Sequence, residues 1–273
     1  MALAEDTGSG DITAAAFVPE GKLARATILA KEEGIVAGME IACAVFLEMD
    51  PSLTVRAFKN DGDSVQCAEA VIALEGSARS ILTGERTALN FLQRLSGIAT
   101  QTRRYVNALA GAQTKILDTR KTTPGWRWLE KLAVRAGGGT NHRTGLYDMV
   151  MVKDNHLSVA GDVAELQAGI DRSHRMQPGV RVELEADSMD QVRKFLTLRG
   201  VNVIMLDNMP LEEMRACAEL ARGKGVQLEA SGGITLERLP EIAATGVDFI
   251  SSGALTHSVK ALDLSLDFEG TAL

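Results

Sequence analysis

Val180-Arg-Val-Glu-Leu184 and Val201-Asn-Val-Ile-Met-Leu206 are the two apolar runs that decide the fold of this 273-residue chain. Each run has the length of a buried strand, and the residues between them leave room for a helical crossover. Further short runs recur roughly 20 to 35 residues apart, at Thr114–Leu117, Met149–Val152, Val226–Leu228 and Val247–Ile250. This alternation predicts six parallel strands joined by helices.

Polar residues follow every one of these runs. They include Asp118, Arg120, Lys121, Lys153, Glu185, Asp207, Glu229, Ser231, Ser251 and Ser252. A parallel β/α barrel carries its function at the carboxyl ends of its strands, so the six ends converge on one site. An open doubly wound sheet also places ligands at strand ends, near its switch point. We favour the barrel, and six units are too few for a closed eight-stranded one, which needs about 250 residues.

The first 110 residues follow a different pattern. Strands are predicted at 23–30, 53–58 and 65–74, a helix at 38–49, and a long amphipathic helix from Thr83 to Leu109. Thr83 is the expected N-cap of the long helix, which places Arg86 in its first turn. We therefore expect a separate N-terminal domain, with the long helix connecting it to the barrel.

Composition excludes several classes of protein. Apolar residues make up 45% and charged residues 24% of the chain, and no apolar run approaches the ~20 residues of a membrane span. The acidic start, Met1 to Asp6, lacks the regions of a secretory signal, which favours a cytoplasmic protein. A net charge of -7 argues against a nucleic-acid partner.

Positive charge is concentrated in one segment. Residues 115–153 carry eight Lys or Arg against three acids, and the rest of the chain holds 21 bases and 33 acids. Five side chains of this segment fall at the predicted strand-end face: Arg120, Lys121, His142, Arg143 and Lys153. The guanidinium fork of arginine suits carboxylates and phosphates. The alternative is that Arg120, Lys121 and Lys153 are ordinary solvent-exposed side chains. Their shared face with the other cations favours an anion site.

Two acidic strand ends and two small-residue turns complete the candidate site. Glu185 and Asp207 fit a Mg²⁺ ion that shares substrate phosphates, hydrogen bonds to sugar hydroxyls, or plain ion pairs with the cations. The turns Ser231-Gly-Gly-Ile234 and Ser251-Ser-Gly-Ala254 follow the last two strands, where barrels commonly bind a phosphate. No histidine pair has the spacing of a zinc site.

In their order along the chain, these motifs resemble the quinolinate phosphoribosyltransferase family over essentially the whole sequence. The matching segments are Ala2-Leu3 with Glu5-Asp6, Gly10-Asp-Ile-Thr13, Glu85-Arg86, Leu95-Ser-Gly-Ile-Ala-Thr100, Asp118-Thr-Arg-Lys-Thr-Thr-Pro-Gly125, Gly137-Gly-Gly-Thr-Asn-His-Arg143, Lys153-Asp-Asn-His156, Leu206-Asp-Asn208, Ser231-Gly-Gly-Ile234 and Gly253-Ala-Leu-Thr-His-Ser258. Members usually carry a further helix ahead of the Ala-Leu motif, at which this chain starts.

The resemblance implies a fold and a reaction. The fold is an N-terminal α/β sandwich domain (1–110) followed by an open, incomplete parallel α/β barrel (111–258) and a C-terminal segment (259–273) that packs back on the first domain. The reaction joins quinolinate to phosphoribosyl pyrophosphate and gives nicotinate mononucleotide, pyrophosphate and CO₂, with Mg²⁺ as cofactor. A homodimer, or a larger assembly of dimers, is implied as well.

The resemblance also implies residue roles. Arg120, His142, Arg143 and Lys153 surround the quinolinate carboxylates and the pyrophosphate, with Lys121 nearby. Arg86 comes from the neighbouring subunit, and Glu185 and Asp207 lie near the ribose and Mg²⁺. The residues that match the 5′-phosphate region are Ser231, Gly232, Gly233, Ser252, Gly253 and His257.

Two other functions stay open at this point. A related enzyme that acts on a monocarboxylate such as nicotinate, or one associated with molybdenum transport, would share the phosphate turns but need fewer cations. A non-catalytic module that binds a phosphorylated sugar would keep the turns without needing Glu185 and Asp207. The full set of cations favours the dicarboxylate enzyme.

Overall fold

The computed structural model describes residues 1–109, 111–153 and 162–270, and its contacts divide the chain into two compact units. Unit 1 comprises Met1–Arg103, Leu129–Gly138 and the segment that begins at Ser258. Unit 2 comprises Arg104–Trp128 and Gly139–His257. Unit 1 thus includes a short segment, 129–138, from within the stretch that the sequence pattern gives to the barrel.

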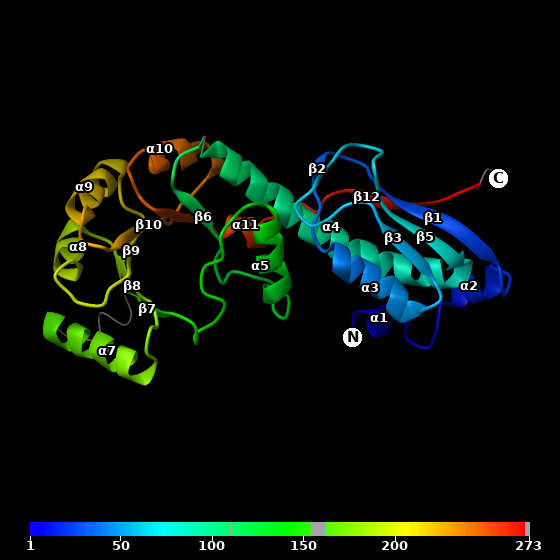
Figure 1. The fold of residues 1–273 in the computed structure, drawn as a ribbon, viewed down its shortest axis with the longest axis horizontal. Helices are drawn as coiled ribbons and strands as arrows, with labels where there is room; N and C mark the ends of the chain where they lie inside the picture. The colour runs from blue at the N-terminus through cyan, green and yellow to red at the C-terminus, as the bar shows by residue number, and fades with distance from the viewer. Residues whose placement is uncertain (110, 154–161, 271–273) are drawn as a thin grey trace. The chain divides into compact units, whose positions relative to one another are not determined.

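Unit 1 is built on a four-stranded antiparallel sheet (Figure 1). Its strands, in spatial order, are β12 (Leu264–Phe268), β1 (Leu23–Ala30), β5 (Ala70–Ser77) and β3 (Thr54–Ala57). The edge strand β12 comes from the end of the chain and pairs with β1 from Ala26↔Phe268 to Ala30↔Leu264. Strands β2 (Gly34–Ile35) and β4 (Ser64–Val65) form a separate two-stranded antiparallel ribbon.

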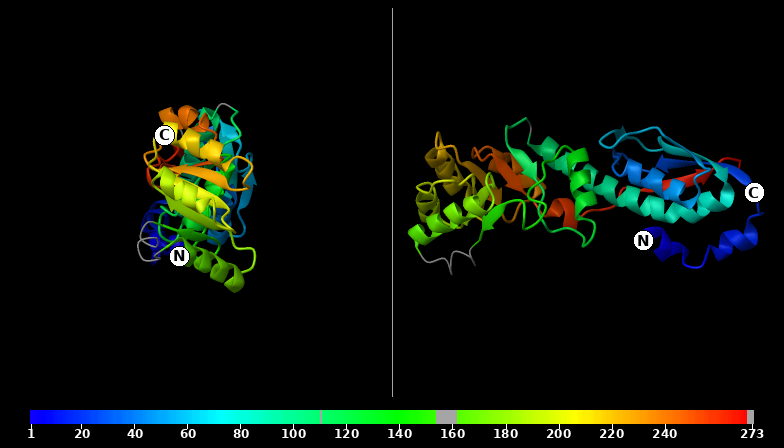
Figure 2. Two further views of the ribbon diagram at one scale, coloured as in Figure 1. Left: turned by 90° about the vertical axis from the view of Figure 1, so that its left-hand side faces the viewer. Right: turned by 60° about the horizontal axis from the view of Figure 1, so that its bottom comes forward.

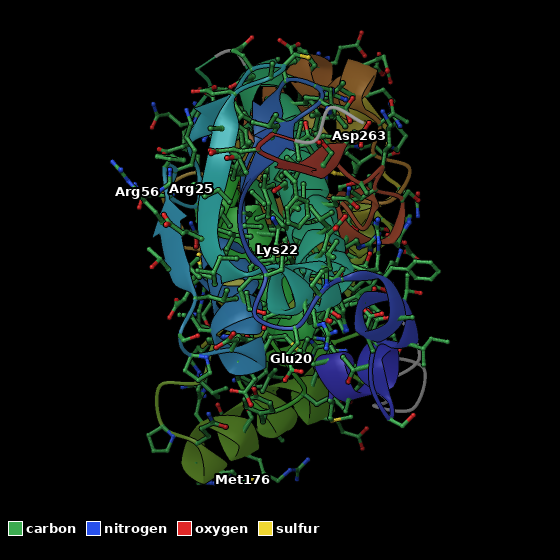
Figure 3. The ribbon with its side chains drawn as sticks, turned by 90° about the vertical axis from the view of Figure 1, so that its right-hand side faces the viewer. Glu20, Lys22, Arg25, Arg56, Met176 and Asp263 are labelled. Carbon is green, nitrogen blue, oxygen red and sulfur yellow. The ribbon has the colours of Figure 1, made fainter. Side chains whose placement is uncertain are left out.

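Helices cover one face of this sheet (Figure 2). The covering helices are α3 (Met39–Met49) and the long α4 (Ala78–Ala108), and the short α1 (Ala2–Thr7) and α2 (Ile12–Phe17) precede the sheet. The core between sheet and helices is apolar, with Ile28, Phe46, Ile72 and Leu92 all at 0% exposure. On the other side, Arg25 and Arg56 point away from the core (Figure 3).

The start of α4 corrects one prediction from the sequence. The helix begins at Ala78 rather than at Thr83. The Thr83 hydroxyl donates to the carbonyl of Arg79, which is the bond of a threonine inside a helix and not of an N-cap. Arg86 therefore lies in the third turn of α4, where its side chain is exposed.

Unit 2 contains a six-stranded, all-parallel sheet. In spatial order the strands are β6 (Lys115–Leu117), β11 (Phe249–Ser251), β10 (Gln227–Ser231), β9 (Val203–Asp207), β8 (Val182–Ala186) and β7 (Val150–Val152). All six predicted strands are present. Within the described ranges β6 and β7 do not pair with each other, so the sheet is an open barrel with two edges.

Helices follow the strands of unit 2 in alternation. They are α5 (Arg127–Ala136), most of which belongs to unit 1, α7 (Val163–Met176), α8 (Met189–Phe195), α9 (Leu211–Ala221), the 3₁₀ turn Leu236–Arg238 with α10 (Leu239–Ala243), and α11 (Ala254–His257). Among the described residues, no helix combines the length and apolar character that crossing a membrane requires.

Strand alternation decides what the interior of unit 2 contains. In β8, Val182, Leu184 and Ala186 are fully buried on one side of the sheet. The intervening Glu183 and Glu185 face the opposite side, where both line cavities. The apolar side packs under the helices, and the other side carries polar groups into the barrel.

Candidate active site

A cavity of about 490 Å³ opens over the carboxyl ends of the strands of unit 2. Most of its wall comes from strand ends and the loops that follow them, with His142 and Arg143 added from the segment ahead of β7. The lining residues are Thr119, Arg120, Lys121, His142, Arg143, Met151, Lys153, Glu185, Met205, Asp207, Asn208, Glu229, Ser231, Gly232, Gly233 and Ser251. The carboxyl ends of all six strands therefore contribute to one pocket.

Two arginines stand close together in this pocket. Arg120 follows β6, and its Nε is buried without a hydrogen-bond acceptor among the residues that the structure describes. Arg143 is half-buried, and burial together with the charge of Arg120 lowers the pKa of its guanidinium. Two neighbouring cations, one with an unpaired buried donor, are an arrangement that an anionic ligand would stabilise.

The acidic side of the pocket lies on β8 and β9. Glu185 accepts a 2.5 Å contact from Nζ of Lys153, and Asp207 accepts a hydrogen bond from the amide of Asn208 at 3.0 Å. The structural ion pair that the sequence left open is thus present for Glu185. Both carboxylates nevertheless line the cavity, so each supplies oxygen atoms to whatever occupies it.

Glycines allow the closest approaches in the site. Gly232 has a φ of +87°, and a Cβ there would lie 2.2 Å from Oδ1 of Asn208. A Cβ on Gly253 would lie 2.8 Å from Cδ of Lys121 and 2.9 Å from Cδ2 of His257. These turns therefore leave backbone open beside the cavity, as phosphate-binding turns require.

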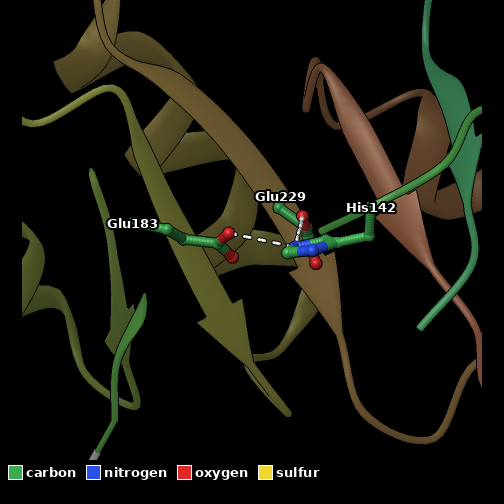
Figure 4. Close-up of side chains that lie close together, drawn as sticks. All are labelled: His142, Glu183 and Glu229. Atoms are coloured by element: carbon green, nitrogen blue, oxygen red, sulfur yellow. Dashed lines mark ion pairs between the residues drawn. The ribbon is translucent and has the colours of Figure 1, made fainter. Parts of the chain in front are cut away.

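His142 is anchored from several directions. Its Nε2 lies 3.0 Å from Oε2 of Glu183 and 3.4 Å from Oε2 of Glu229 (Figure 4). Its backbone N–H donates to the fully buried Asp118 at 2.7 Å. Burial alone lowers the pKa of His142, but the two glutamates outweigh it and raise the pKa to about 9. Burial also raises the pKa of Glu183, against the effect of His142.

Most of the predicted site residues lie in this pocket, and the others divide into two groups. Ser252, Gly253 and His257 follow β11 directly beside Ser251, which lines the pocket. Arg86 belongs to unit 1 and is not among the pocket-lining residues. Of the motif Lys153-Asp-Asn-His156, only Lys153 falls within the described residues.

Sequence reasoning missed Glu183 and noted Glu229 only as a polar residue at the end of a predicted strand. Glu183 and Glu229 are each 1% exposed and lie within their strands rather than at the ends. The signal was present in the alternation of Val-Glu-Leu-Glu-Ala, which places Glu183 and Glu185 on one face. Asp118 was noted as a strand-end polar residue and as part of a motif but given no role, although it accepts hydrogen bonds from the backbone of His142 and the amide of Asn141.

The open parallel α/β barrel carries clustered cations, two carboxylates and two Ser-Gly turns at one end. This combination defines an enzyme site for a substrate with several negative charges. Comparison with known proteins agrees with this class. Residues 11–96 match the quinolinate phosphoribosyl transferase N-terminal domain, and residues 98–267 match the corresponding C-terminal domain. The chain belongs to the quinolinate phosphoribosyl transferase family.

Individual relatives are similar over almost their whole length. A probable nicotinate-nucleotide pyrophosphorylase [carboxylating] of Bacillus subtilis is 47% identical, over 96% of this chain and 89% of its own. A mitochondrial quinolinate phosphoribosyltransferase [decarboxylating] of Nicotiana glauca is 46% identical, over 98% and 80%. The nicotinate-nucleotide pyrophosphorylase structure from Francisella tularensis has a TM-score of 0.92 and 40% identity, covering 98% and 93%.

Proposed function

We propose that this chain transfers the phosphoribosyl group of phosphoribosyl pyrophosphate to quinolinate and releases pyrophosphate and CO₂, giving nicotinate mononucleotide. The observation that carries this function is the pair Arg120 and Arg143 in the carboxyl-end pocket, with a buried guanidinium donor of Arg120 that has no acceptor among the described residues. The names of the relatives at 46–47% identity support the same reaction.

The dicarboxylate binds at the cationic side of the pocket. Arg120, His142, Arg143 and Lys153 provide four positive groups, and arginine holds a carboxylate through two parallel hydrogen bonds. The incoming donor is itself strongly anionic, so these cations must screen its repulsion from quinolinate before the pyridine nitrogen can approach the ribose. Arg120 and Arg143 repel one another in the free protein. A bound anion between them offsets this repulsion.

The phosphates bind at the turns. Ser231, Gly232 and Gly233 after β10, with Ser252, Gly253 and His257 after β11, hold the 5′-phosphate through backbone N–H groups and side-chain donors. Lys121, which lies against Gly253, serves the pyrophosphate. Negative charge that develops on the departing pyrophosphate is stabilised by cations already in place.

Glu185 and Asp207 hold the ribose and a Mg²⁺ ion. Their carboxylates project into the same cavity from neighbouring strands, and hard oxygen donors of this kind fit Mg²⁺, which takes one or two carboxylates and completes its shell with substrate phosphates and water. When bound, the ion would neutralise charge on the leaving pyrophosphate. The carboxylates themselves stabilise positive charge that develops on the ribose ring.

Decarboxylation follows from the product of the transfer. Once the ring nitrogen bears the ribose it is cationic, and the electron pair left when the adjacent carboxylate departs as CO₂ is held beside that positive charge. A proton then takes the place of CO₂ on this carbon. The chain's part is to hold the ring by its second carboxylate while the bond breaks.

The active assembly is proposed to be a homodimer, or a larger assembly of dimers, in the cytoplasm. Arg86 on α4 is exposed in the single chain and would enter the partner's site. Its companion Glu85 is half-buried, and burial raises the pKa of that carboxyl, so Arg86 alone of the pair is presented to a partner.

A two-product assay tests the function. Purified protein with Mg²⁺ and phosphoribosyl pyrophosphate should release pyrophosphate and CO₂ in equal amounts when quinolinate is added. Nicotinate should turn over poorly, because it lacks one carboxylate for the cationic cluster to hold. Turnover of nicotinate at the quinolinate rate without CO₂ would assign a monocarboxylate enzyme, and binding of the phosphorylated sugar without either product would assign a non-catalytic module.

A further inference from the structure

The interior of the barrel holds three ionisable side chains at one level. His142 Nε2 faces Glu183 of β8 and Glu229 of β10 at 3.0 and 3.4 Å, and β9 lies between these two strands (Figure 4). Each glutamate is 1% exposed, and the His142 side chain is 7% exposed. Because both carboxylates stand on the middle of paired strands, their positions are fixed by the sheet.

Stability does not explain this cluster. Both oxygens of Glu183 and Oε1 of Glu229 are buried without a hydrogen-bond donor among the described residues, so their contacts with His142 are ion pairs by distance only. Buried carboxylates in this condition are costly, and neutral replacements of the same shape are often no less stable. Such groups persist where the reaction needs them.

The cluster separates two cavities. One is the active-site pocket of about 490 Å³, and the other, of about 580 Å³, opens at the amino ends of the strands. His142, Arg143 and Glu229 line both cavities, whereas Glu183 lines only the second. The imidazole therefore has the active-site pocket on one side and Glu183 behind it, while Glu229 stands in the wall of both cavities.

We propose that Glu183 and Glu229 are positioning residues that hold His142 at this boundary as a cation, so that it contributes one of the positive charges that bind the dicarboxylate. This role rests on the function proposed above. Both glutamates act through the imidazole, Glu183 from outside the active-site pocket and Glu229 from its wall.

Charged groups around the ring support this role. Glu183 and Glu229 favour the imidazolium, and Arg143, a cation that lines the same two cavities, disfavours it by its like charge. Asp118, at the end of β6, is held to the backbone N–H of His142. Burial lowers the pKa of the imidazole, and the two glutamates raise it past its ordinary value of 6.5 to about 9.

One contact favours the neutral ring. Nδ1 of His142 accepts from the backbone N–H of Arg143 at 2.7 Å, which requires the proton to be on Nε2. That bond joins adjacent residues and opens with a small rotation of the ring, whereas the two carboxylates are fixed on strands. We therefore take the carboxylates to decide the charge, and protonation turns Nδ1 into a second donor.

The test uses Glu229→Gln and Glu183→Gln, which keep shape and remove charge, and Glu219→Gln as a matched control. Glu219 is exposed on α9 and pairs only with Arg222 among the described residues. NMR of ¹³C-labelled histidine follows the titration of His142, and separate KM values are measured for quinolinate and phosphoribosyl pyrophosphate between pH 6 and 9.5. The NMR titrations are recorded both without and with a chelator.

In the wild-type protein His142 is expected to titrate near pH 9. In Glu183→Gln and in Glu229→Gln the titration should fall by at least about one pH unit. At pH 8 the KM for quinolinate should rise about twofold if the titration falls by about one unit and about tenfold if it falls by about two. It should change little at pH 6, where the ring is charged in either protein. The KM for phosphoribosyl pyrophosphate and the melting temperature should stay close to those of the control.

Three results would overturn the inference: a wild-type titration near 6.5, an equal rise of both KM values at every pH, or a titration that appears only after the chelator removes a metal from the cluster. If wild-type protein released no pyrophosphate from quinolinate, the proposed function would fail instead. The NMR titration would still decide whether the glutamates hold His142 charged.

Discussion

The interiors of the two units are opposite in character. In unit 1, the sheet and its helices enclose apolar side chains such as Ile28, Phe46 and Ile72, all fully buried. In unit 2, the concave face of the sheet encloses Glu183, Glu229 and His142, which are nearly as inaccessible. Unit 2 gains its apolar burial on the other face of its strands, under the helices. The difference teaches that the two faces of the sheet in unit 2 have separate roles. The face covered by helices stabilises the fold, and the face inside the barrel carries the polar groups of the binding site.

The largest expected effect comes from mixing a variant of unit 1 with a variant of unit 2. This experiment asks whether unit 1 of one subunit supplies a residue to the active site in unit 2 of its partner. Arg86→Ala in unit 1 and Lys153→Ala in unit 2 should each reduce activity about a thousandfold or more. When the two are unfolded, mixed and refolded, half the dimers are mixed and each has one intact site, so about a quarter of wild-type activity should return. Steady-state pyrophosphate release measures the recovery.

Sizing each sample by chromatography shows whether dimers are present. Folded, dimeric mixtures that stay inactive would mean that Arg86 serves its own chain or takes no part in the reaction.

Asp207→Asn sharpens the comparison within unit 2, since it changes the ligand-binding face and leaves the helix-covered face intact. We expect kcat/KM to fall by about 2 to 4 kcal/mol of transition-state stabilisation, roughly 30- to 1000-fold, with an unchanged melting temperature. Wild-type activity should also disappear in a chelator and return with Mg²⁺. Asp190→Asn, at the exposed start of α8, is the matched control. A variant that keeps its activity and melts early would show that Asp207 has a structural role.

The smallest expected effect is a pH dependence of stability confined to unit 2. The pKa of His142 is raised from 6.5 to about 9 on folding, so its stabilisation is complete below pH 6.5 and is lost as the pH rises through 9. The free energy of unfolding should therefore fall by about 1 to 3 kcal/mol across that window. Both tryptophans, Trp126 and Trp128, lie in unit 2, so urea unfolding followed by their fluorescence reports on this unit.

His142→Asn should flatten this slope. An equal slope in the variant would place the pH dependence in other groups.

The sequence predicted the strands of unit 2 well because each buried parallel strand is an apolar run bounded by polar residues. Val201–Leu206, for example, corresponds to β9 at Val203–Asp207. Polar residues that follow such runs must lie at one edge of the sheet, and Arg120, Lys153 and Asp207 were found there for that reason. The recognition of the family, from motifs spread over the chain, is confirmed by both domain matches.

Other features depend on contacts that a local pattern does not contain. Ser77 accepts from the backbone N–H of Ser80 at 3.3 Å at the true start of α4. The sequence offered Thr83 as an equally good cap, although five residues precede it in the helix. Glu183 resembled an ordinary polar residue in a strand until the sheet brought Glu229 and His142 to it. The assignment of residues 129–138 to unit 1 depends likewise on long-range packing, including the ion pair between Arg94 and the buried Glu130.

The pairing of β12 with β1 has a consequence for synthesis of the chain. β1 ends at Ala30, whereas its edge partner β12 spans Leu264–Phe268, so the two strands leave the ribosome more than two hundred residues apart. Until residues 264–268 have been synthesised, β1 presents an open edge and Leu264 is missing from the core it joins. Unit 2 is fully synthesised by His257. The domain made first is thus the domain completed last, and a nascent chain that stalls before residue 264 exposes a strand edge to its neighbours on the same message.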